Sequence, residues 1–176
     1  MSEHRATIEW MGSASPGDFV KGRYSRVHRW TFDGGVVVDA SPSPSVVPAP
    51  WSNPEHVDPE EAYVASISSC HMLTFLFVAA KAGFTVTHYR DEAVGVMTKS
   101  PQGKAWISRV TLAPTICYAG DRSPTAGEVA HLHHAAHEGC FIASSVKTEI
   151  LVAPPGAAEG KTETESQAEG PGQVDA

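Results

Sequence analysis

The chain has 176 residues, of which 41% are hydrophobic and 19% are charged. This length and apolar content suit one folded domain with a buried core and exclude a wholly disordered chain. The formal net charge is −7, and the lysines and arginines form no basic cluster, so we expect neither a nucleic-acid partner nor a membrane partner. Residues 1–10 are polar and lack the apolar run of a secretory signal, which predicts a cytoplasmic location.

The C-terminal end of the sequence is acidic and rich in small residues. Residues 154–176 contain five acidic residues and one lysine among glycine, proline, serine and threonine. Such a composition does not bury enough apolar surface to fold. We therefore predict a folded domain over residues 1–153 and a disordered acidic tail over residues 154–176. Because the tail carries more than half of the net charge, the acidity of the chain says little about its substrate.

The first third of the sequence predicts three strands and a long loop. Side chains alternate between two faces over residues 24–32, and residues 36–38 are three valines, so the Asp-Gly-Gly segment at 33–35 predicts a hairpin turn between them. A shorter strand over residues 6–11 is expected to pair with this hairpin. Residues 41–57 contain five prolines, which exclude helix interior and central strand and predict a surface loop.

A helix of about 24 residues is predicted over residues 58–82. Asp58 suits the N-cap position, Glu61 completes a capping box three residues later, and Gly83 suits the position that ends a helix. Residues 73–80 are apolar on nearly every side of this helix, which predicts burial all round. A domain of this size rarely buries a helix completely, so we expect a second copy of the chain to cover part of it.

The remaining elements complete an α+β domain. Residues 84–97 and 106–118 predict two strands joined by a turn at Ser100-Pro101-Gln102-Gly103. A second helix is expected over residues 125–138 and a final strand over residues 145–152. Strands grouped around two helices are typical of the α+β class.

The chain has three cysteines, and an odd number without an export signal argues against structural disulfides. Cys70 lies within the long helix, and Cys140 follows the end of the second helix. These two residues are either small buried side chains or a reactive thiol with a resolving partner. Cys117 lies on the strand over residues 106–118 and is expected to be a core residue.

A group of histidines precedes Cys140 on the second predicted helix. His133 and His137 are four residues apart, and His137 and Cys140 are three apart, so each pair shares a helix face at a spacing compatible with metal binding. No zinc-type signature accompanies them, and we expect solvent-facing histidines without a dedicated metal site. The complete group is His131, His133, His134 and His137.

Two segments resemble the osmotically inducible protein C and organic hydroperoxide resistance family (OsmC/Ohr). They are residues 58–72, DPEEAYVASISSCHM, with Ala-Gly-Phe at 82–84, and residues 134–147, HAAHEGCFIASSVK. The two cysteine blocks occur in the order of the family, and the similarity spans residues 6–152. The resemblance implies an OsmC/Ohr-like fold, with antiparallel sheets around a long central helix that carries the first cysteine, and an intertwined homodimer.

The resemblance also implies a thiol peroxidase that reduces organic hydroperoxides to alcohols. Cys70 would be the peroxidatic cysteine, Cys140 the resolving cysteine, and Glu60 the carboxylate ten residues upstream. The two thiols would form a disulfide that an external dithiol, of the lipoyl type in this family, reduces again. No metal or other cofactor is implied.

The family also places an arginine beside the reactive thiol, where its charge favours the thiolate. The loop over residues 41–57 contains no arginine, so Arg26 is expected to take this role, with Arg23 as the other candidate. Ten residues of straight helix separate Glu60 from Cys70 by about 15 Å along the axis. Unless the helix is kinked, Glu60 would therefore serve the cysteine of a partner subunit.

Three aromatic residues are candidates for an apolar substrate pocket, although such residues are more often plain core. They are Trp30, Phe32 and Phe75. The alternative functions are a non-catalytic ligand- or metal-binding protein on the same fold and a redox sensor, because a fold alone does not define a function.

Overall fold

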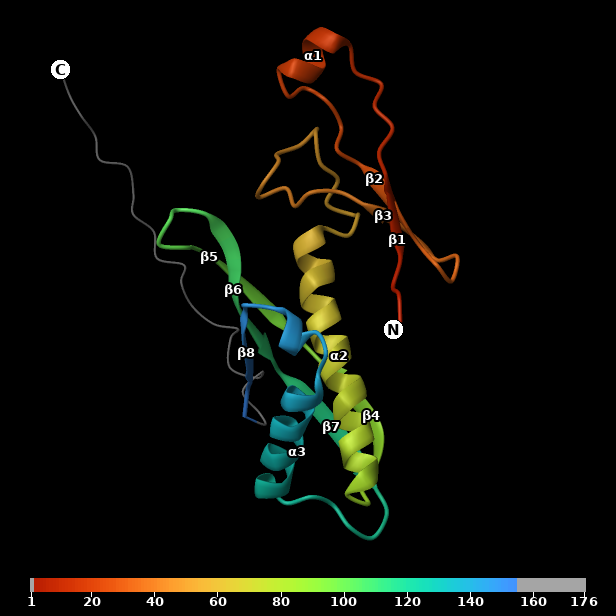
Figure 1. Ribbon diagram of the computed structural model, residues 1–176, viewed down its shortest axis with the longest axis vertical. Coiled ribbons are helices and arrows are strands. Elements are labelled where there is room, and N and C mark those ends of the chain that lie inside the picture. The colour runs from red at the N-terminus through yellow and green to blue at the C-terminus, as the bar shows by residue number, and fades with distance from the viewer. Residues whose placement is uncertain (1, 155–176) are drawn as a thin grey trace, which may run out of the picture.

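One long helix, α2 (Pro59–Lys81), forms the axis of the molecule (Figure 1). The structure is a computed structural model, and it describes residues 2–154. At the start of α2 the Asp58 carboxylate accepts a hydrogen bond from the Glu61 amide, and the Glu61 carboxylate accepts one from the Asp58 amide, at 2.7 and 3.2 Å. Gly83 follows the helix with φ of +81°. The predicted capping box and glycine stop are confirmed.

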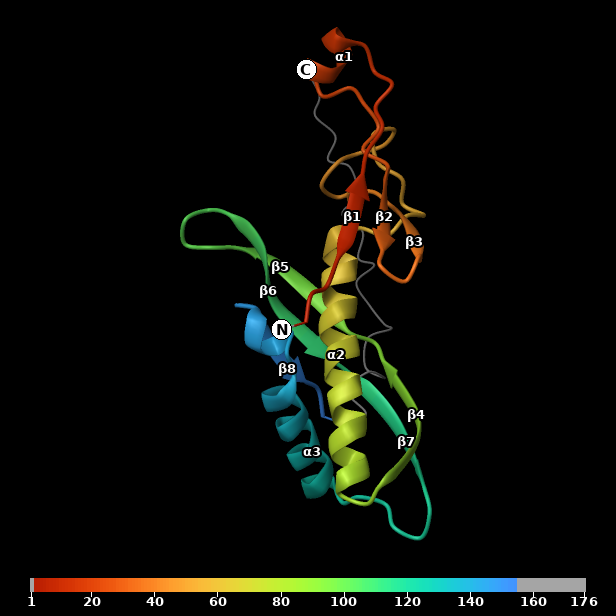
Figure 2. The same ribbon diagram turned by 45° about the vertical axis from the view of Figure 1, so that its right-hand side comes forward.

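The N-terminal part forms an antiparallel sheet that projects beyond the N-terminal end of α2 (Figures 1 and 2). Its strands are β1 (Ala6–Glu9), β2 (His28–Phe32) and β3 (Val37–Ala40), in that order. The predicted hairpin is confirmed, but its first strand starts at residue 28 instead of 24. The reason is that the Arg26 amide donates to the Trp51 carbonyl of the long loop and not to a neighbouring strand.

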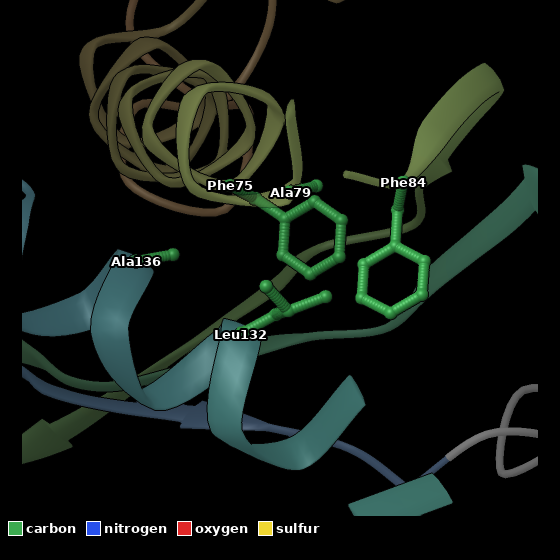
Figure 3. Packing of buried hydrophobic residues seen from close by; sticks show 5 residues of the cluster. All are labelled: Phe75, Ala79, Phe84, Leu132 and Ala136. Carbon is green, nitrogen blue, oxygen red and sulfur yellow. The ribbon is translucent and has the colours of Figure 1, made fainter. Parts of the chain in front are cut away.

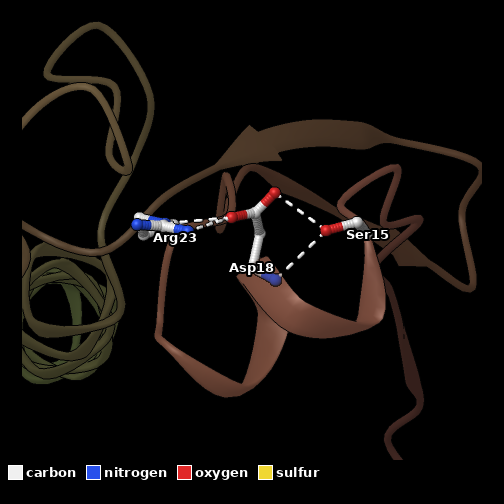
Figure 4. Close-up of polar contacts among 3 residues, drawn as sticks. All are labelled: Ser15, Asp18 and Arg23. Atoms are coloured by element: carbon white, nitrogen blue, oxygen red, sulfur yellow. Dashed lines mark hydrogen bonds and ion pairs between the residues drawn. The ribbon is translucent and has the colours of Figure 1, made fainter.

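A short helix, α1 (Pro16–Val20), lies between β1 and β2 and was not predicted. The Ser15 hydroxyl caps it by accepting a hydrogen bond from the Asp18 amide at 3.1 Å. The Asp18 carboxylate in turn accepts from Ser15 and from the Arg23 guanidinium (Figure 4). These two hydrogen bonds lower the pKa of Asp18, Ser15 having the larger effect.

The second half of the chain contributes five strands in two further sheets. Each long strand predicted over residues 84–97 and 106–118 is in fact broken into two. The Asp91 carboxylate accepts from the Ala113 amide at 2.7 Å, and Pro114 has no amide hydrogen, so a continuous ladder is interrupted here. The strands are β4 (Thr85–Asp91), β5 (Val94–Lys99), β6 (Ala105–Leu112), β7 (Pro114–Ala119) and β8 (Glu149–Val152).

These five strands form the sheets β4–β7 and β5–β6–β8. The pairs of β4 with β7 and of β5 with β6 are antiparallel, as expected, whereas β6 and β8 pair in parallel. The final strand is also shorter than predicted: it starts at residue 149 instead of 145, and a 3-10 turn over Ala143–Ser145 precedes it. The α+β class is confirmed.

Helix α3 (Ala126–Gly139) runs alongside the C-terminal half of α2, as both ribbon views show. Thr125 caps it, and Glu128 completes a second capping box. Cys140 is its C-cap residue, as the sequence predicted.

Two hydrophobic clusters hold α2 in place. Around its C-terminal half, Phe75 and Ala79 pack with Phe84, the residue before β4, and with Leu132 and Ala136 of α3 (Figure 3). Around its N-terminal half, a second cluster joins α2 to β6 and consists of Ile67, Val110 and Leu112. The helix therefore connects both sheets of the second half to α3.

One copy of the chain does not bury α2 on every side. Phe75 and Ala79 are fully buried, but Leu73 is 61% exposed and Phe77 is 58% exposed. By length and composition alone, α2 is able to cross a membrane. In one chain, α2 packs against α3 and the sheets through its buried residues.

Candidate active site

The packing of α3 against α2 brings two cysteines together that are 70 residues apart in the sequence. Cys70 lies in the middle of α2 and Cys140 at the end of α3. The Cys140 thiol donates a hydrogen bond to the Cys70 sulfur at 2.8 Å. Cys70 is partly exposed, whereas Cys140 is 1% exposed. Cys70 is therefore the more accessible residue of the pair.

The surroundings of Cys140 favour its protonated form. Burial raises the pKa of the Cys140 thiol, and its hydrogen bond to Cys70 raises it further. The Ala143 amide donates to the Cys140 sulfur at 3.4 Å, which acts in the opposite direction. A protonated Cys140 is the form that donates to the Cys70 sulfur. The pair is thus chemically asymmetric.

Gly139 allows the end of α3 to approach α2 closely. A Cβ at this position would lie 3.0 Å from the Cγ2 atom of Thr74 on α2. Thr74 itself donates its hydroxyl to the Cys70 carbonyl at 2.9 Å. The predicted helix ended just before Gly139, and the packing role of this glycine was not predicted. The Gly-Cys dipeptide at 139–140 was the sequence feature that indicated this role, because a glycine beside a candidate reactive cysteine lets a second helix pack closely there.

The structure does not bring Glu60 to the cysteines. Glu60 lies in the first turn of α2 and lines a cleft of about 810 Å³ between α2 and β5. Three other carboxylates line the same cleft, those of Asp58, Glu61 and Asp91. α2 spans these positions as one helix, so Glu60 stays about 15 Å along the axis from Cys70.

The two candidate arginines lie in the N-terminal part and have local partners there. Nη1 of Arg26 donates to the carbonyls of Gly22 and Tyr24, at 3.1 and 2.8 Å, and its guanidinium lies 4.1 Å from the centre of the Tyr24 ring. Arg23 forms an ion pair with Asp18 (Figure 4). Between residues 2 and 154 of one chain, no hydrogen bond or ion pair joins either arginine to a cysteine or to Glu60.

The three aromatic residues predicted to line a substrate pocket lie in two places. Trp30 and Phe32 are on β2 of the N-terminal sheet; Trp30 is half-buried, and Phe32 is 40% exposed. Phe75 is fully buried in the cluster around α2 and α3 (Figure 3). Within one chain, the structure therefore does not combine them into one surface.

The histidines of α3 do not form a metal site in the part of the chain that the structure describes, where no three His, Cys, Asp or Glu side chains converge. His134 is exposed and lies 3.5 Å from Glu138 one turn away. His133 instead faces α2, where its Nδ1 atom lies 3.0 Å from Nε2 of His71. The expectation of a solvent-facing side chain is wrong for His133, because this side of α3 packs against α2.

Cys117 is exposed, so its expected place in the core is also wrong. Its neighbours Ile116 and Tyr118 point the other way, toward the cluster beneath α2 and α3. Successive side chains of a strand alternate between faces, and only one face of the β4–β7 sheet is covered by the helices.

Comparison with known proteins agrees with this fold. The family model for OsmC-like protein matches residues 52–154, and the chain belongs to this family. An OsmC-like protein of unknown function from Vibrio cholerae is 48% identical, with a TM-score of 0.82 over 87% of this chain and 99% of that chain. A search of the curated proteins finds no match.

Two more distant structures share the fold. An organic hydroperoxide resistance protein from Elizabethkingia anophelis is 18% identical and has a TM-score of 0.62, over 86% of this chain and 93% of that chain. The organic hydroperoxide resistance protein OhrB of Bacillus subtilis is 17% identical and has a TM-score of 0.58, over 86% of this chain and 98% of that chain.

Proposed function

We propose that the protein is a thiol-dependent peroxidase that reduces organic hydroperoxides to alcohols, with Cys70 as the peroxidatic and Cys140 as the resolving cysteine. The observation that carries this proposal is the contact of 2.8 Å between the sulfurs of two cysteines, one partly exposed and one buried. Names of structural relatives such as the Bacillus subtilis protein point to the same chemistry.

The proposed cycle needs only thiol chemistry. The Cys70 thiolate attacks the terminal peroxide oxygen, the O–O bond breaks, and the alkoxide takes up a proton and leaves as the alcohol. Cys70 is then a sulfenic acid. The Cys140 sulfur attacks the Cys70 sulfur, the S–O bond breaks, and the hydroxyl leaves as water with the thiol proton. An external dithiol, of the lipoyl type in our proposal, reduces the disulfide and becomes a disulfide itself. No metal or other cofactor takes part.

A homodimer would complete this site. Glu60 and Arg26 lie away from Cys70 in one chain, and α2 leaves Leu73 and Phe77 more than half exposed. If two copies pack through this face of α2, Glu60 and Arg26 of one copy are available to the Cys70 of the other. Among the described residues Arg26 uses only Nη1 in hydrogen bonds, so Nη2 and Nε are available to a thiolate and a carboxylate.

The same arrangement provides an apolar wall for the substrate. The N-terminal sheet carries Trp30 and Phe32, and in the proposed dimer these residues would line the site of the second subunit. Aromatic walls favour an organic hydroperoxide over hydrogen peroxide. Arg26 is the proposed activating residue, and we place the protein in the cytoplasm, where thiols are kept reduced.

Consumption of cumene hydroperoxide by the reduced protein with dihydrolipoamide tests the proposal. We expect turnover in the wild type and in Cys117→Ser, a matched control with an exposed thiol, and none in Cys70→Ser. Intact mass after one equivalent of peroxide should fall by two hydrogens in the wild type, and Cys140→Ser should retain one added oxygen. Full turnover in Cys70→Ser would refute the peroxidatic assignment. Oxidised thiols that no dithiol reduces would instead favour a redox sensor.

A further inference from the structure

A second polar contact joins α2 and α3 next to the thiols. His71 follows Cys70 directly in α2, and His133 lies seven residues before Cys140 in α3. Nε2 of His71 and Nδ1 of His133 are 3.0 Å apart, and the two rings are nearly parallel, with an interplanar angle of 12°. The same pair of helices is therefore linked once through sulfur and once through imidazole.

The imidazole pair is enclosed. His71 is 1% exposed, and its Nδ1 atom has no hydrogen-bond partner among the described residues. The Phe75 ring packs on His133 with ring centres 4.5 Å apart. The other titratable groups facing this region are His137 of α3, Asp91 and Tyr89 of β4, and Tyr118 of β7. The Asp91 carboxylate accepts from Ser68 and from the Ala113 amide.

Only neutral rings suit this contact. In a neutral pair, one ring nitrogen donates its proton and the facing nitrogen accepts it. Protonation of one ring places a charge in an apolar seam, and when both rings are protonated two donors also face each other at 3.0 Å. Burial lowers the pKa of both histidines to about 4, with the neighbouring histidines as a further cause for His71. The pair is thus neutral at physiological pH and becomes charged in acid.

We propose that His71 and His133 are a positioning pair for disulfide closure: as neutral rings they hold α3 against α2 so that Cys140 reaches Cys70, and acid that charges them slows this step. The inference rests on the proposed function. In this step the Cys140 sulfur bonds to the Cys70 sulfur, the S–O bond of the sulfenic acid breaks, and water leaves. Cys140 is the group of α3 that contacts the Cys70 sulfur, so in the Cys140→Ser background we expect the histidine pair to leave attack on the peroxide unchanged.

The test separates the two steps. Sulfenic acid formation is followed in the Cys140→Ser background, and closure is followed by acid quenching and intact mass in proteins that retain both cysteines. We expect His71→Leu, which leaves His133 without its partner, to slow closure at pH 7 at least about fivefold, because a buried polar group loses its hydrogen bond. Sulfenic acid formation should stay unchanged. His134→Gln changes an exposed histidine of the same helix and should leave both steps unchanged.

A double variant, His71→Gln with His133→Gln, distinguishes positioning from a general loss of structure. Two amides are able to donate and accept as the neutral rings do, but they do not titrate. We expect closure at pH 7 close to the wild-type rate. At pH 4, where each ring is half protonated if the two titrate independently, the wild type should close about fourfold more slowly than the double variant.

Identical pH profiles for closure in the wild type and the double glutamine variant would overturn the proposal, as would unchanged closure in His71→Leu. The same proteins are also oxidised with diamide. Diamide forms an adduct on one thiol; the second thiol then forms the disulfide, and the reduced diamide leaves as the hydrazine. If peroxide yields no sulfenic acid on Cys70, the proposed function fails, and the diamide reaction still measures whether the histidine pair controls closure.

Discussion

Acid should destabilise the protein through the buried pair His71 and His133. Both have a pKa lowered from 6.5 to about 4 in the folded protein, mainly by burial. Between these values the unfolded chain binds more protons than the folded one, so the free energy of unfolding falls as the pH decreases below 6.5 and stops falling below about 4. At neutral pH and above, this contribution to stability is fully present.

The magnitude follows from these two pKa values. A shift from 6.5 to 4 removes about 1.8 kcal/mol per histidine between pH 7 and pH 5. Because His133 retains some contact with solvent, which screens its charge, we expect a total loss of about 2–3 kcal/mol for the pair. Asp18 and Glu128 have lowered pKa values, so their own contributions are lost only below this pH range.

Urea unfolding followed by circular dichroism at pH 7, 6 and 5, at one protein concentration, measures this loss. The double variant His71→Gln with His133→Gln should lose less than about 1 kcal/mol over the same range. His134→Gln, on the exposed side of α3, should behave as the wild type does. Equal free energies of unfolding at pH 5 and pH 7 in the wild type would refute the reasoning, and so would an undiminished loss in the double variant.

Three further predictions concern packing and association. Gly95→Ala should destabilise the fold by about 1–3 kcal/mol in urea unfolding, because the new Cβ would lie 2.5 Å from Cγ2 of Val64. The control Gly127→Ala, which has open space around the new Cβ in α3, should be neutral or stabilising by up to about 1 kcal/mol. Asp58→Ala removes the N-cap of α2 and should cost about 1 kcal/mol in the same assay, and an unchanged midpoint would contradict the capping box. Phe77→Ala should weaken the proposed dimer in sedimentation velocity while leaving the circular dichroism spectrum intact, and an unaltered sedimentation coefficient across dilution would count against association through α2.

Sequence patterns predicted best those features that depend on neighbouring residues. The ends of α2 follow from Asp58 and Gly83, since capping and a positive φ are local properties, and both agree with the structure within one residue. The break between β4 and β5 was missed because it depends on Asp91 reaching the Ala113 amide 22 residues later. A pattern of alternating residues contains no information about such a contact.

The candidate site divides in the same way. The sequence by itself determined that two cysteines lie in helix-associated blocks resembling one family, and hence which residues are the candidates for thiol chemistry. Only the tertiary structure decided that Cys140 lies 2.8 Å from Cys70 and that His133 faces His71 instead of solvent. Both results depend on which side of α3 packs against α2. The side of α3 that faces α2 is determined by the burial of Leu132 and Ala136 in a hydrophobic cluster, and the other members of this cluster come from distant parts of the chain.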